Sequence, residues 1–348
     1  MLEQAVAENA SDIFLVAGRP LSLRKNGILS MENEERLLPD DTAAFLKEIY
    51  ELADNRDMRS LLSHGDDDFS FAIPGVSRFR VSAYKQRGTL SAVIRVITFR
   101  LPDYHMLGIP DAIINLGLGG KGMTLITGPA GSGKSTTLAC LIDRINSTEE
   151  THIITLEDPL EFLHSHKKSI VSQREICTDT ENYLTALRAS LRQSPDVILL
   201  GEMRDYETIN TAMTAAETGH LIFSTLHTIG AASTIDRIID AFPASQQRQV
   251  SIQLSMVLQA IVSQALLPST DGRMIPAFEI MVMTPAIRNL IREGKTHQID
   301  GMIYSSNSTT MISMDNYLLQ LFQKGLITKH TALENASNPE MLARKLGV

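Results

Sequence analysis

The sequence predicts an α/β protein of two domains, the second of which is built around a mostly parallel sheet. The chain has 348 residues, which is too long for most single hydrophobic cores. Strand-like patterns dominate residues 1 to about 100, whereas apolar strands alternate with helical stretches from about residue 112. Such alternation is typical of a parallel sheet that helices cover on both faces. We therefore expect an N-terminal α+β domain followed by an α/β domain.

The composition excludes several classes of protein. Hydrophobic residues make up 43% of the chain and charged residues 21%, as in an ordinary globular protein. The net charge of -8 argues against a protein that coats nucleic acid, so we expect no nucleic-acid partner. No run of about 18 apolar residues occurs, so we expect no transmembrane segment. The N-terminus carries Glu3 and Glu8 and no basic region, which argues against a signal peptide.

The two cysteines, Cys140 and Cys177, belong to no Cys-x-x-Cys pair. This argues against a cysteine-rich zinc site and against a disulfide framework, so we expect no zinc. Two unpaired cysteines fit the reducing environment of the cytoplasm, which is where we expect the protein.

Residues 1–100 are predicted to form the first domain. Two short strands are expected around the turn at residues 18–20, and one or two amphipathic helices over 41–62. Three strand-like runs follow, separated by Pro-Gly and Arg-Gly turns, at residues 68–73, 77–84 and 90–97.

The last two of these runs place arginines on one face. We assume that they pair as an antiparallel hairpin with their alternating apolar residues on one side. Arg80 and Arg95 must then both point to the other side, because side chains alternate with period two. Two arginines on a sheet face are either solvated side chains or a clamp for an anion, and the pattern leaves both interpretations open.

Residues 101–111, LPDYHMLGIPD, contain two prolines and a glycine and are predicted to link the domains. The second domain then spans residues 112–348. Its candidate strands cover 123–127, 152–157, 169–176, 196–202 and 221–227, and the main helices between them cover 134–146, 180–193 and 205–217. Beyond about residue 231 we expect mainly helix, including a long amphipathic helix over 245–267. A short strand pair is expected around 273–282, within a mainly helical C-terminal part at 270–348.

A phosphate-binding loop is the strongest motif. Residues 128–135, GPAGSGKS, match the pattern G-x-x-x-x-G-K-[ST] between an apolar strand and a helix. In this setting backbone N–H groups and the helix N-terminus bind phosphates, Lys134 reaches the β- and γ-phosphates, and the Ser135 hydroxyl binds Mg²⁺. ATP and Mg²⁺ are thus the expected cofactors. The predicted binding residues are Gly128, Pro129, Ala130, Gly131, Ser132, Gly133, Lys134, Ser135 and Thr136.

Carboxylates follow two other predicted strands. Ligands collect at the carboxyl ends of parallel strands, and Glu202 stands there after the apolar run 197–200. We assign Glu202 to orienting or deprotonating the attacking water. Glu157, at the end of 152–157, is the first choice among a second group that includes Asp158 and Glu161, whose roles the sequence leaves open.

Two histidines flank the strand at 221–227. His227 lies at its carboxyl end, where a side chain could sense the γ-phosphate, and is predicted to be catalytic. His220 lies at the other end of the strand, and its role stays open.

Near the C-terminus, residues 284–295 have the pattern of an amphipathic helix. Pro285 begins it, and Ile287, Leu290 and Ile291 form an apolar stripe of helical period. The remaining polar residues are predicted to face solvent or a partner: Arg288, Asn289, Arg292 and Glu293.

Four stretches in this order resemble the ATPase superfamily of type II secretion and type IV pili: the phosphate loop, LEDPLEF, VILLGEMRD and TGHLIFSTLHT. In that family they are the Walker A motif, the Asp box, the Walker B motif and the His box. The resemblance is greatest to the retraction ATPases of the PilT type, whose signature matches AIRNLIRE at residues 286–293. Assembly and secretion members carry an additional N-terminal domain and usually a four-cysteine zinc motif, and this sequence shows neither.

The resemblance implies a hexameric ring that hydrolyses ATP to power pilus retraction and twitching motility. It implies a PAS-like N-terminal domain, a RecA-like ATPase domain with a helical C-terminal extension, and ATP bound between the two. Arg80 and Arg95 correspond by position to two family arginines at the γ-phosphate. The implied partner is an inner-membrane pilus platform protein. The protein is implied to bind it at the cytoplasmic face of that membrane. The polar face of AIRNLIRE is implied to serve retraction and not hydrolysis.

Three alternatives remain from the sequence. A RecA-like nucleic-acid motor is opposed by the acidic charge and by the lack of an aromatic and basic stacking surface. A nucleotide-binding regulator without hydrolysis is opposed by the presence of Glu202 and Glu157. An assembly motor is opposed by the missing zinc motif.

Overall fold

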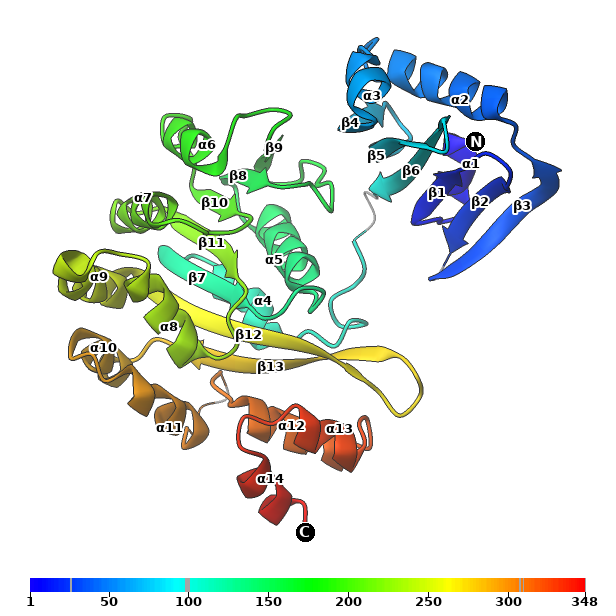
Figure 1. Ribbon diagram of the computed structural model, residues 1–348. Coiled ribbons are helices and arrows are strands. Elements are labelled where there is room, and N and C mark those ends of the chain that lie inside the picture. The colour runs from blue at the N-terminus through cyan, green and yellow to red at the C-terminus, as the bar shows by residue number, and fades with distance from the viewer. Residues whose placement is uncertain (26, 98–100, 307, 309, 348) are drawn as a thin grey trace. The chain divides into compact units, whose positions relative to one another are not determined.

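The computed structural model describes residues 1–25, 27–97, 101–306, 308 and 310–347. The chain divides into two compact units (Figure 1). The first comprises Met1–Arg100 together with Leu160–Leu163, and the second comprises Leu101–Pro159 and His164–Val348.

The first unit is a six-stranded antiparallel sheet with three helices. The order of the strands is β3-β2-β1-β6-β5-β4. Their bounds are β1 Asp12–Leu15, β2 Pro20–Lys25, β3 Ile28–Arg36, β4 Asp66–Ile73, β5 Ser77–Gln86 and β6 Thr89–Ile97. The helices are α1 Leu2–Ala7, α2 Pro39–Leu52 and α3 Arg59–His64. The predicted strands and helices of this region are confirmed, but the edge strand β3 was not predicted, because its residues 32–36 are all polar and show no alternation.

One face of this sheet packs on α2. Phe79, Val81 and Ala83 of β5 are buried and share a hydrophobic cluster with Leu46 and Ile49 of α2. Because side chains alternate along a strand, the residues between these apolar ones lie on the opposite face of the sheet.

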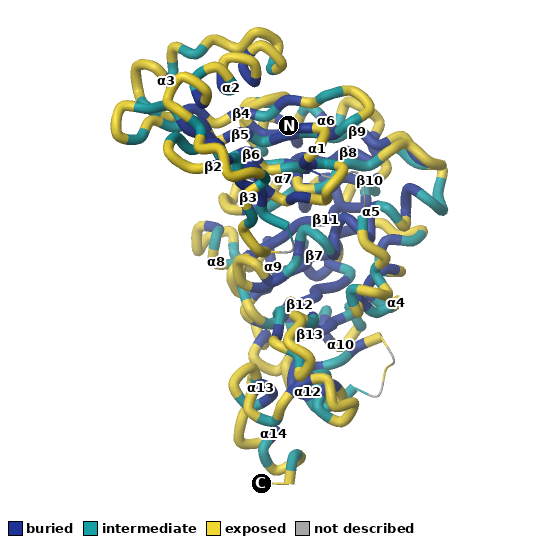
Figure 2. Tube along the Cα trace, turned by 90° about the vertical axis from the view of Figure 1, so that its right-hand side faces the viewer, coloured by how far each residue is buried: buried dark blue, intermediate teal, exposed yellow. Residues whose placement is uncertain are grey.

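The second unit is a seven-stranded sheet with the order β13-β12-β7-β11-β10-β8-β9. All neighbouring strands are parallel except β12 and β13. The strands are β7 Gly122–Thr127, β8 His152–Glu157, β9 Ile170–Glu175, β10 Val197–Leu200, β11 Leu221–Leu226, β12 Leu258–Pro268 and β13 Met274–Val282. Every residue of β7, β10 and β11 is buried, as the dark blue trace of β7 and β11 in Figure 2 shows.

Helices cover both faces of this sheet, as the sequence predicted. The helices are α4 Asp111–Ile114, α5 Lys134–Thr148, α6 Tyr183–Ser190, α7 Tyr206–Glu217, α8 Ala231–Asp240, α9 Ala244–Val257, α10 Pro285–Arg292, α11 Ile299–Tyr304, α12 Met314–Gln323, α13 Lys329–Glu334 and α14 Pro339–Lys345. Two hydrophobic clusters fill the space between the sheet and its helices. Helices α4 and α5 contribute to one cluster, and helices α6 to α11 contribute to the other. The helices α12 to α14 form a third cluster with Leu267 of β12 and Ala277 of β13.

The long helix predicted over residues 245–267 is wrong in its second half. Helix α9 ends at Val257, and Leu258 begins strand β12, which pairs with β7. The apolar residues of β12 are buried on both faces, so their pattern is continuous and does not distinguish a strand from a buried helix. The strand pair expected around 273–282 is likewise corrected, because only β13 lies there and its partner is β12.

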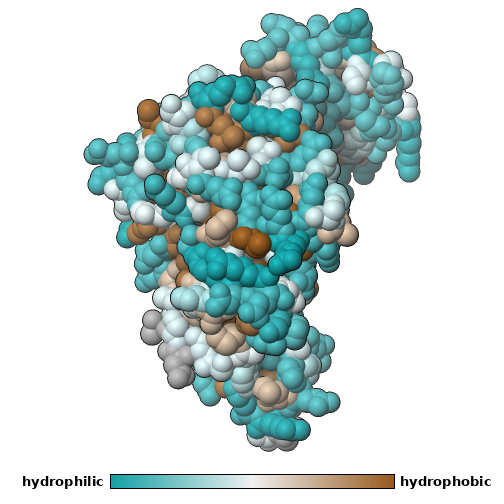
Figure 3. Space-filling model, turned by 90° about the vertical axis from the view of Figure 1, so that its left-hand side faces the viewer, coloured by the Kyte–Doolittle hydropathy of each residue, from teal (hydrophilic) through white to brown (hydrophobic). Residues whose placement is uncertain are grey.

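Hydrophobic side chains form small separate patches on the mostly hydrophilic face drawn in Figure 3. Among the described residues, none of the helices has the length and apolar character needed to cross a membrane.

Candidate functional site

The phosphate loop connects strand β7 to helix α5. Its three glycines, Gly128, Gly131 and Gly133, have φ values of 137, 77 and 87°, which residues with a side chain rarely adopt. Gly133 is the residue that precedes the helix, and Lys134 begins it. The loop therefore needs glycine at these positions to turn its backbone inward at the positive end of a helix.

Lys134 is held inside the loop. Its Nζ atom donates hydrogen bonds to the carbonyl oxygens of Gly128 and Pro129, both at 2.8 Å, and the residue is only 8% exposed. Ser132 is buried, and its Oγ has no hydrogen-bond partner within the described part of the chain. A buried ammonium group, a buried hydroxyl and a helix N-terminus together fit the phosphates of a nucleotide.

The remaining loop residues surround this cradle. Pro129 and Ala130 are exposed, whereas Ser135 and Thr136 lie half-buried in the first turn of α5. Within the described ranges, no three His, Cys, Asp or Glu side chains are grouped so that they could hold a metal ion by themselves. The binding of Mg²⁺ by the Ser135 hydroxyl together with the phosphates stays a prediction.

The strand order brings the other predicted motifs to the same edge of the sheet. The loop follows β7, His227 follows the neighbouring β11, Glu202 follows β10, and Glu157 ends β8. These four strands are parallel, so their carboxyl ends meet at one edge. Glu157 directly follows Leu156, and Glu202 lies two residues after Leu200. Leu156 and Leu200 are direct partners in the β8–β10 ladder, and Gly201 N donates to Leu156 O at 2.8 Å.

Glu202 and His227 form a pair at this edge. The Oε2 atom of Glu202 lies 3.5 Å from Nε2 of His227, and its Oε1 atom accepts from the guanidinium of Arg204. The Glu202 side chain is 13% exposed, whereas the side chains of His227 and Arg204 are 60% and 76% exposed. A well-covered carboxylate beside an open imidazole is an arrangement in which the carboxylate could orient a water, and the catalytic roles of Glu202 and His227 stay predictions.

Tyr183, at the start of α6, was not predicted. A Cβ atom added at Gly201 would lie 2.7 Å from its hydroxyl oxygen, which places that hydroxyl at the ends of β8 and β10. Burial raises the pKa of the hydroxyl well above its usual range, and the carboxylates of Glu202, Asp158 and Glu157 raise it further. Tyr183 is therefore a protonated donor beside the two predicted catalytic carboxylates. No motif of the sequence marks it, because it precedes β10 by fourteen residues of helix and turn.

Of the three residues whose roles were open, His220 lies away from this edge of the sheet. His220 binds the Ala215 carbonyl oxygen through Nδ1 at 2.9 Å, at the amino end of β11 and away from the loop. It therefore has the environment of a structural histidine. Asp158 and Glu161 are exposed beyond the end of β8.

Arg80 and Arg95 of the first unit are direct partners in the β5–β6 ladder and so lie on one face of the sheet, as the alternation predicted. Arg95 Nε donates to Asp12 Oδ1 at 3.2 Å, and Asp12 is its direct partner on β1. Asp12 also lies 3.8 Å from Nη1 of Arg24, on β2. The sequence did not predict the role of Asp12, because its partners are 12 and 83 residues away.

Helix α10 has its predicted apolar stripe. Ile287 and Ile291 are fully buried, and Leu290 packs against the same cluster. On the predicted polar face Arg292 is exposed, as expected, whereas Arg288 is half-buried, and both arginines also make contacts that were not predicted.

The Arg288 guanidinium donates to the carbonyl oxygens of Ser255 and Met256, at 2.6 and 3.0 Å, and Arg292 Nε donates to Ser255 Oγ at 2.9 Å. Both arginines therefore hold the C-terminal end of α9, where positive charge is favourable. Asn289 and Glu293 are exposed.

Comparison with known proteins gives consistent matches. The family model described as type II/IV secretion system protein matches residues 1–274. The type IV pilus retraction ATPase PilT of Pseudomonas aeruginosa is 44% identical over 340 residues, which are 98% of each chain. A twitching motility protein of Neisseria gonorrhoeae is 47% identical over 277 residues, which are 79% of this chain and 74% of the relative.

Solved structures agree with these matches. A crystal structure of the pilus retraction motor PilT with bound ADP superimposes with a TM-score of 0.89 at 46% identity and covers 98% of this chain and 97% of its own. The ATPase DotB of Legionella pneumophila gives a TM-score of 0.77 at 30% identity and covers 95% and 92%. The family resemblance that four motifs indicated is thus confirmed over nearly the full length of the chain. The chain belongs to the type II/IV secretion system protein family.

Proposed function

We propose that the chain is a motor ATPase that hydrolyses ATP to power type IV pilus retraction and twitching motility. The observation that carries this proposal is the single sheet edge that collects the phosphate loop, His227, Glu202 and Glu157. The similarity to PilT over 98% of both chains supports the retraction function.

In the proposed reaction, ATP binds with its phosphates in the loop, and the Ser135 hydroxyl would hold Mg²⁺, which would supply charge balance and polarisation of the γ-phosphate. Lys134 stabilises the β- and γ-phosphates. Glu202 orients the attacking water or takes its proton, with Glu157 beside it, and His227 responds to the γ-phosphate. Arg80 and Arg95 contact the γ-phosphate from the PAS-like domain.

We further propose a PAS-like domain over residues 1–100, a linker over 101–111 and a RecA-like domain over 112–348. The antiparallel sheet of the first unit and the parallel sheet of the second support these assignments. Loss of the γ-phosphate ends the arginine contacts, and the linker absorbs the resulting change of conformation. Six copies form a ring that acts on a pilus platform protein at the cytoplasmic face of the inner membrane.

An assembly or secretion ATPase of the same superfamily is the second candidate. The type II secretion system protein E of Xanthomonas campestris is 47% identical, but over only 119 residues, or 34% of this chain. The PilT relative matches nearly three times that length, which favours retraction.

Deletion of the gene tests the direction of action. We expect cells with more surface pili and without twitching motility, restored by the wild-type gene and not by a Lys134→Ala copy. Loss of pili from the deletion strain would instead favour an assembly motor. Phosphate release by the purified chain, measured with and without DNA, separates both from a nucleic-acid motor and from a regulator that does not hydrolyse ATP.

A further inference from the structure

Gln264 is a buried amide that no motif explains. It lies on β12, the strand beside β7, and is only 3% exposed. A buried amide needs hydrogen-bond partners, because an unpaired buried polar group costs about 1–3 kcal/mol. The contacts of the Gln264 amide therefore indicate which part of the structure this residue stabilises.

The side chain of Gln264 lies against the end of the phosphate loop. Thr137 Oγ1, in the first turn of α5, donates to Gln264 Oε1 at 2.8 Å, and Thr137 is itself fully buried. A Cβ atom added at Gly133 would lie 2.9 Å from Gln264 Nε2. The amide thus fills the space between the last glycine of the loop and the helix that follows.

The backbone of Gln264 lies against the start of the loop. A Cβ atom added at Gly128 would lie 2.1 Å from the Gln264 carbonyl oxygen, so no side chain fits between them. One residue therefore contacts the first and the last glycine of the motif. A loop of glycines has many conformations in the absence of such contacts, and restricting it costs free energy on ligand binding.

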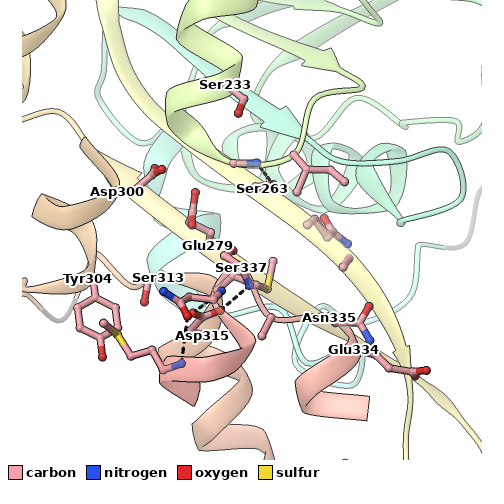
Figure 4. A pocket seen from close by; sticks show the side chains of 18 of the residues that line it. Ser233, Ser263, Glu279, Asp300, Tyr304, Ser313, Asp315, Glu334, Asn335 and Ser337 are labelled. Carbon is pink, nitrogen blue, oxygen red and sulfur yellow. Dashed lines mark hydrogen bonds between the residues drawn. The ribbon is translucent and has the colours of Figure 1, made fainter. Parts of the chain in front are cut away.

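The residue next to Gln264 holds the turn after His227. Ser263 Oγ accepts from Gly230 N at 3.0 Å, and Glu279 of the neighbouring β13 accepts from Ala231 N at 2.9 Å. Figure 4 shows Ser263 and Glu279 in a cavity of about 750 Å³ that Gln264 and Pro129 also line. Gln264 and Ser263 are adjacent on β12. Gln264 thus contacts the phosphate loop, and Ser263 contacts the turn that follows His227.

We propose that Gln264 is a positioning residue that holds the phosphate loop in the conformation that binds the β-phosphate of a nucleotide. The proposal rests on the nucleotide-binding function proposed above. Gln264 acts through Thr137 and the loop glycines and makes no bond with the nucleotide itself.

The test is a double-mutant cycle of Gln264→Met and Thr137→Val in the full-length chain. Both replacements keep the volume and remove the polar atoms of the bond. We expect each single variant to bind ADP about five- to tenfold more weakly than the wild type, the effect of one buried hydrogen bond. The double variant should bind ADP no more weakly than Gln264→Met alone, because the same bond is lost. AMP, which has no β-phosphate, should bind all of the variants with nearly the same affinity.

A matched control lies on the same strand. Gln259 Nε2 would lie 2.9 Å from a Cβ atom added at Gly122, at the amino end of β7 and away from the loop. Gln259→Met should therefore leave the affinity for ADP unchanged, whatever it does to the thermal unfolding midpoint. Nucleotide affinity and unfolding midpoint together separate a loop effect from a general loss of stability.

Wild-type ADP affinity in Gln264→Met, or effects of the two replacements that multiply in the double variant, would overturn the proposal. An equal loss of AMP and ADP affinity would also overturn it. If Gln264→Met does not fold, the selective loss of ADP binding in Thr137→Val carries the test. Lys134→Ala tests the underlying function separately, because unchanged ADP binding in that variant means that the loop is not the nucleotide site.

Discussion

Arg80 and Arg95 face each other directly across the β5–β6 ladder. Two like charges in direct register repel each other, so this pair needs compensation. Asp12 provides it: its Oδ1 atom accepts from Arg95 Nε at 3.2 Å, and Asp12 itself is only 5% exposed. The arginine pair is therefore held at one end by a carboxylate that is far more buried than the Arg95 side chain, which is 67% exposed.

Replacement of Asp12 by asparagine should lower kcat for ATP hydrolysis by about fivefold, because asparagine keeps an acceptor for Arg95 but loses the negative charge that orients the guanidinium. The KM for ATP should change less, because the phosphate loop that binds ATP is unaltered. Steady-state ATPase assays of the purified protein measure both constants.

Arg24→Gln is the matched control, because Arg24 approaches the same carboxylate from the other side, at 3.8 Å. It should leave kcat within about twofold, as surface ion pairs contribute little. Equal losses in the two variants would show that Asp12 supports the sheet in general and not Arg95.

Glu202→Ala should bind ATP with nearly wild-type affinity and lose at least about 100-fold in kcat, because a positioned general base contributes at least that factor. Binding is measured by titration with a fluorescent ATP analogue, and turnover by phosphate release. Arg204→Gln removes the exposed partner of Glu202 and keeps the carboxylate, so its kcat should fall far less. Near-normal hydrolysis by Glu202→Ala would transfer the role of base to Glu157.

The surface of α10 is tested most cleanly at Asn289 and Glu293, since Arg288 and Arg292 hold the end of α9. Asn289→Asp combined with Glu293→Lys should spare ATPase activity and the unfolding midpoint and abolish twitching motility. Arg288→Glu should in addition lower the free energy of unfolding by about 1–3 kcal/mol, because two carbonyl oxygens lose their donor. Normal motility in the Asn289 and Glu293 variant would remove these two residues from the partner surface.

The sequence predicted those parts of the molecule in which local pattern and tertiary structure agree. The common face of Arg80 and Arg95 followed from alternation, and the placing of Glu202 and His227 followed from strands that end in polar residues. The prediction was wrong for β12, because a strand buried on both faces has no period. Gln264 and Asp12 were missed for another reason: each is defined by a partner more than 80 residues away, and only the fold brings them together.

The buried imidazole of His164 makes the stability of the folded protein depend on pH. Its side chain is 3% exposed, and burial lowers the pKa of the imidazole to about 4. Asp143 on α5, 4.0 Å from Nδ1, raises the pKa in part, and Lys167 lowers it further. The imidazole therefore stays neutral in the folded chain, whereas in the unfolded chain it takes up a proton below its ordinary pKa of 6.5.

Between pH 6.5 and about 4 the unfolded chain thus binds more protons than the folded chain, so stability falls as the pH falls through this window. The contribution of His164 is fully present above pH 6.5, and its loss by pH 4 amounts to at most roughly 3 kcal/mol. Urea unfolding at pH 7.5, 6 and 5 should show a flatter decline for His164→Gln than for the wild type. His297→Gln, which changes an exposed histidine, shows what the loss of a surface imidazole does to the same curve. Parallel curves for wild type and His164→Gln would mean that the folded chain accepts the proton at His164 as readily as the unfolded chain does.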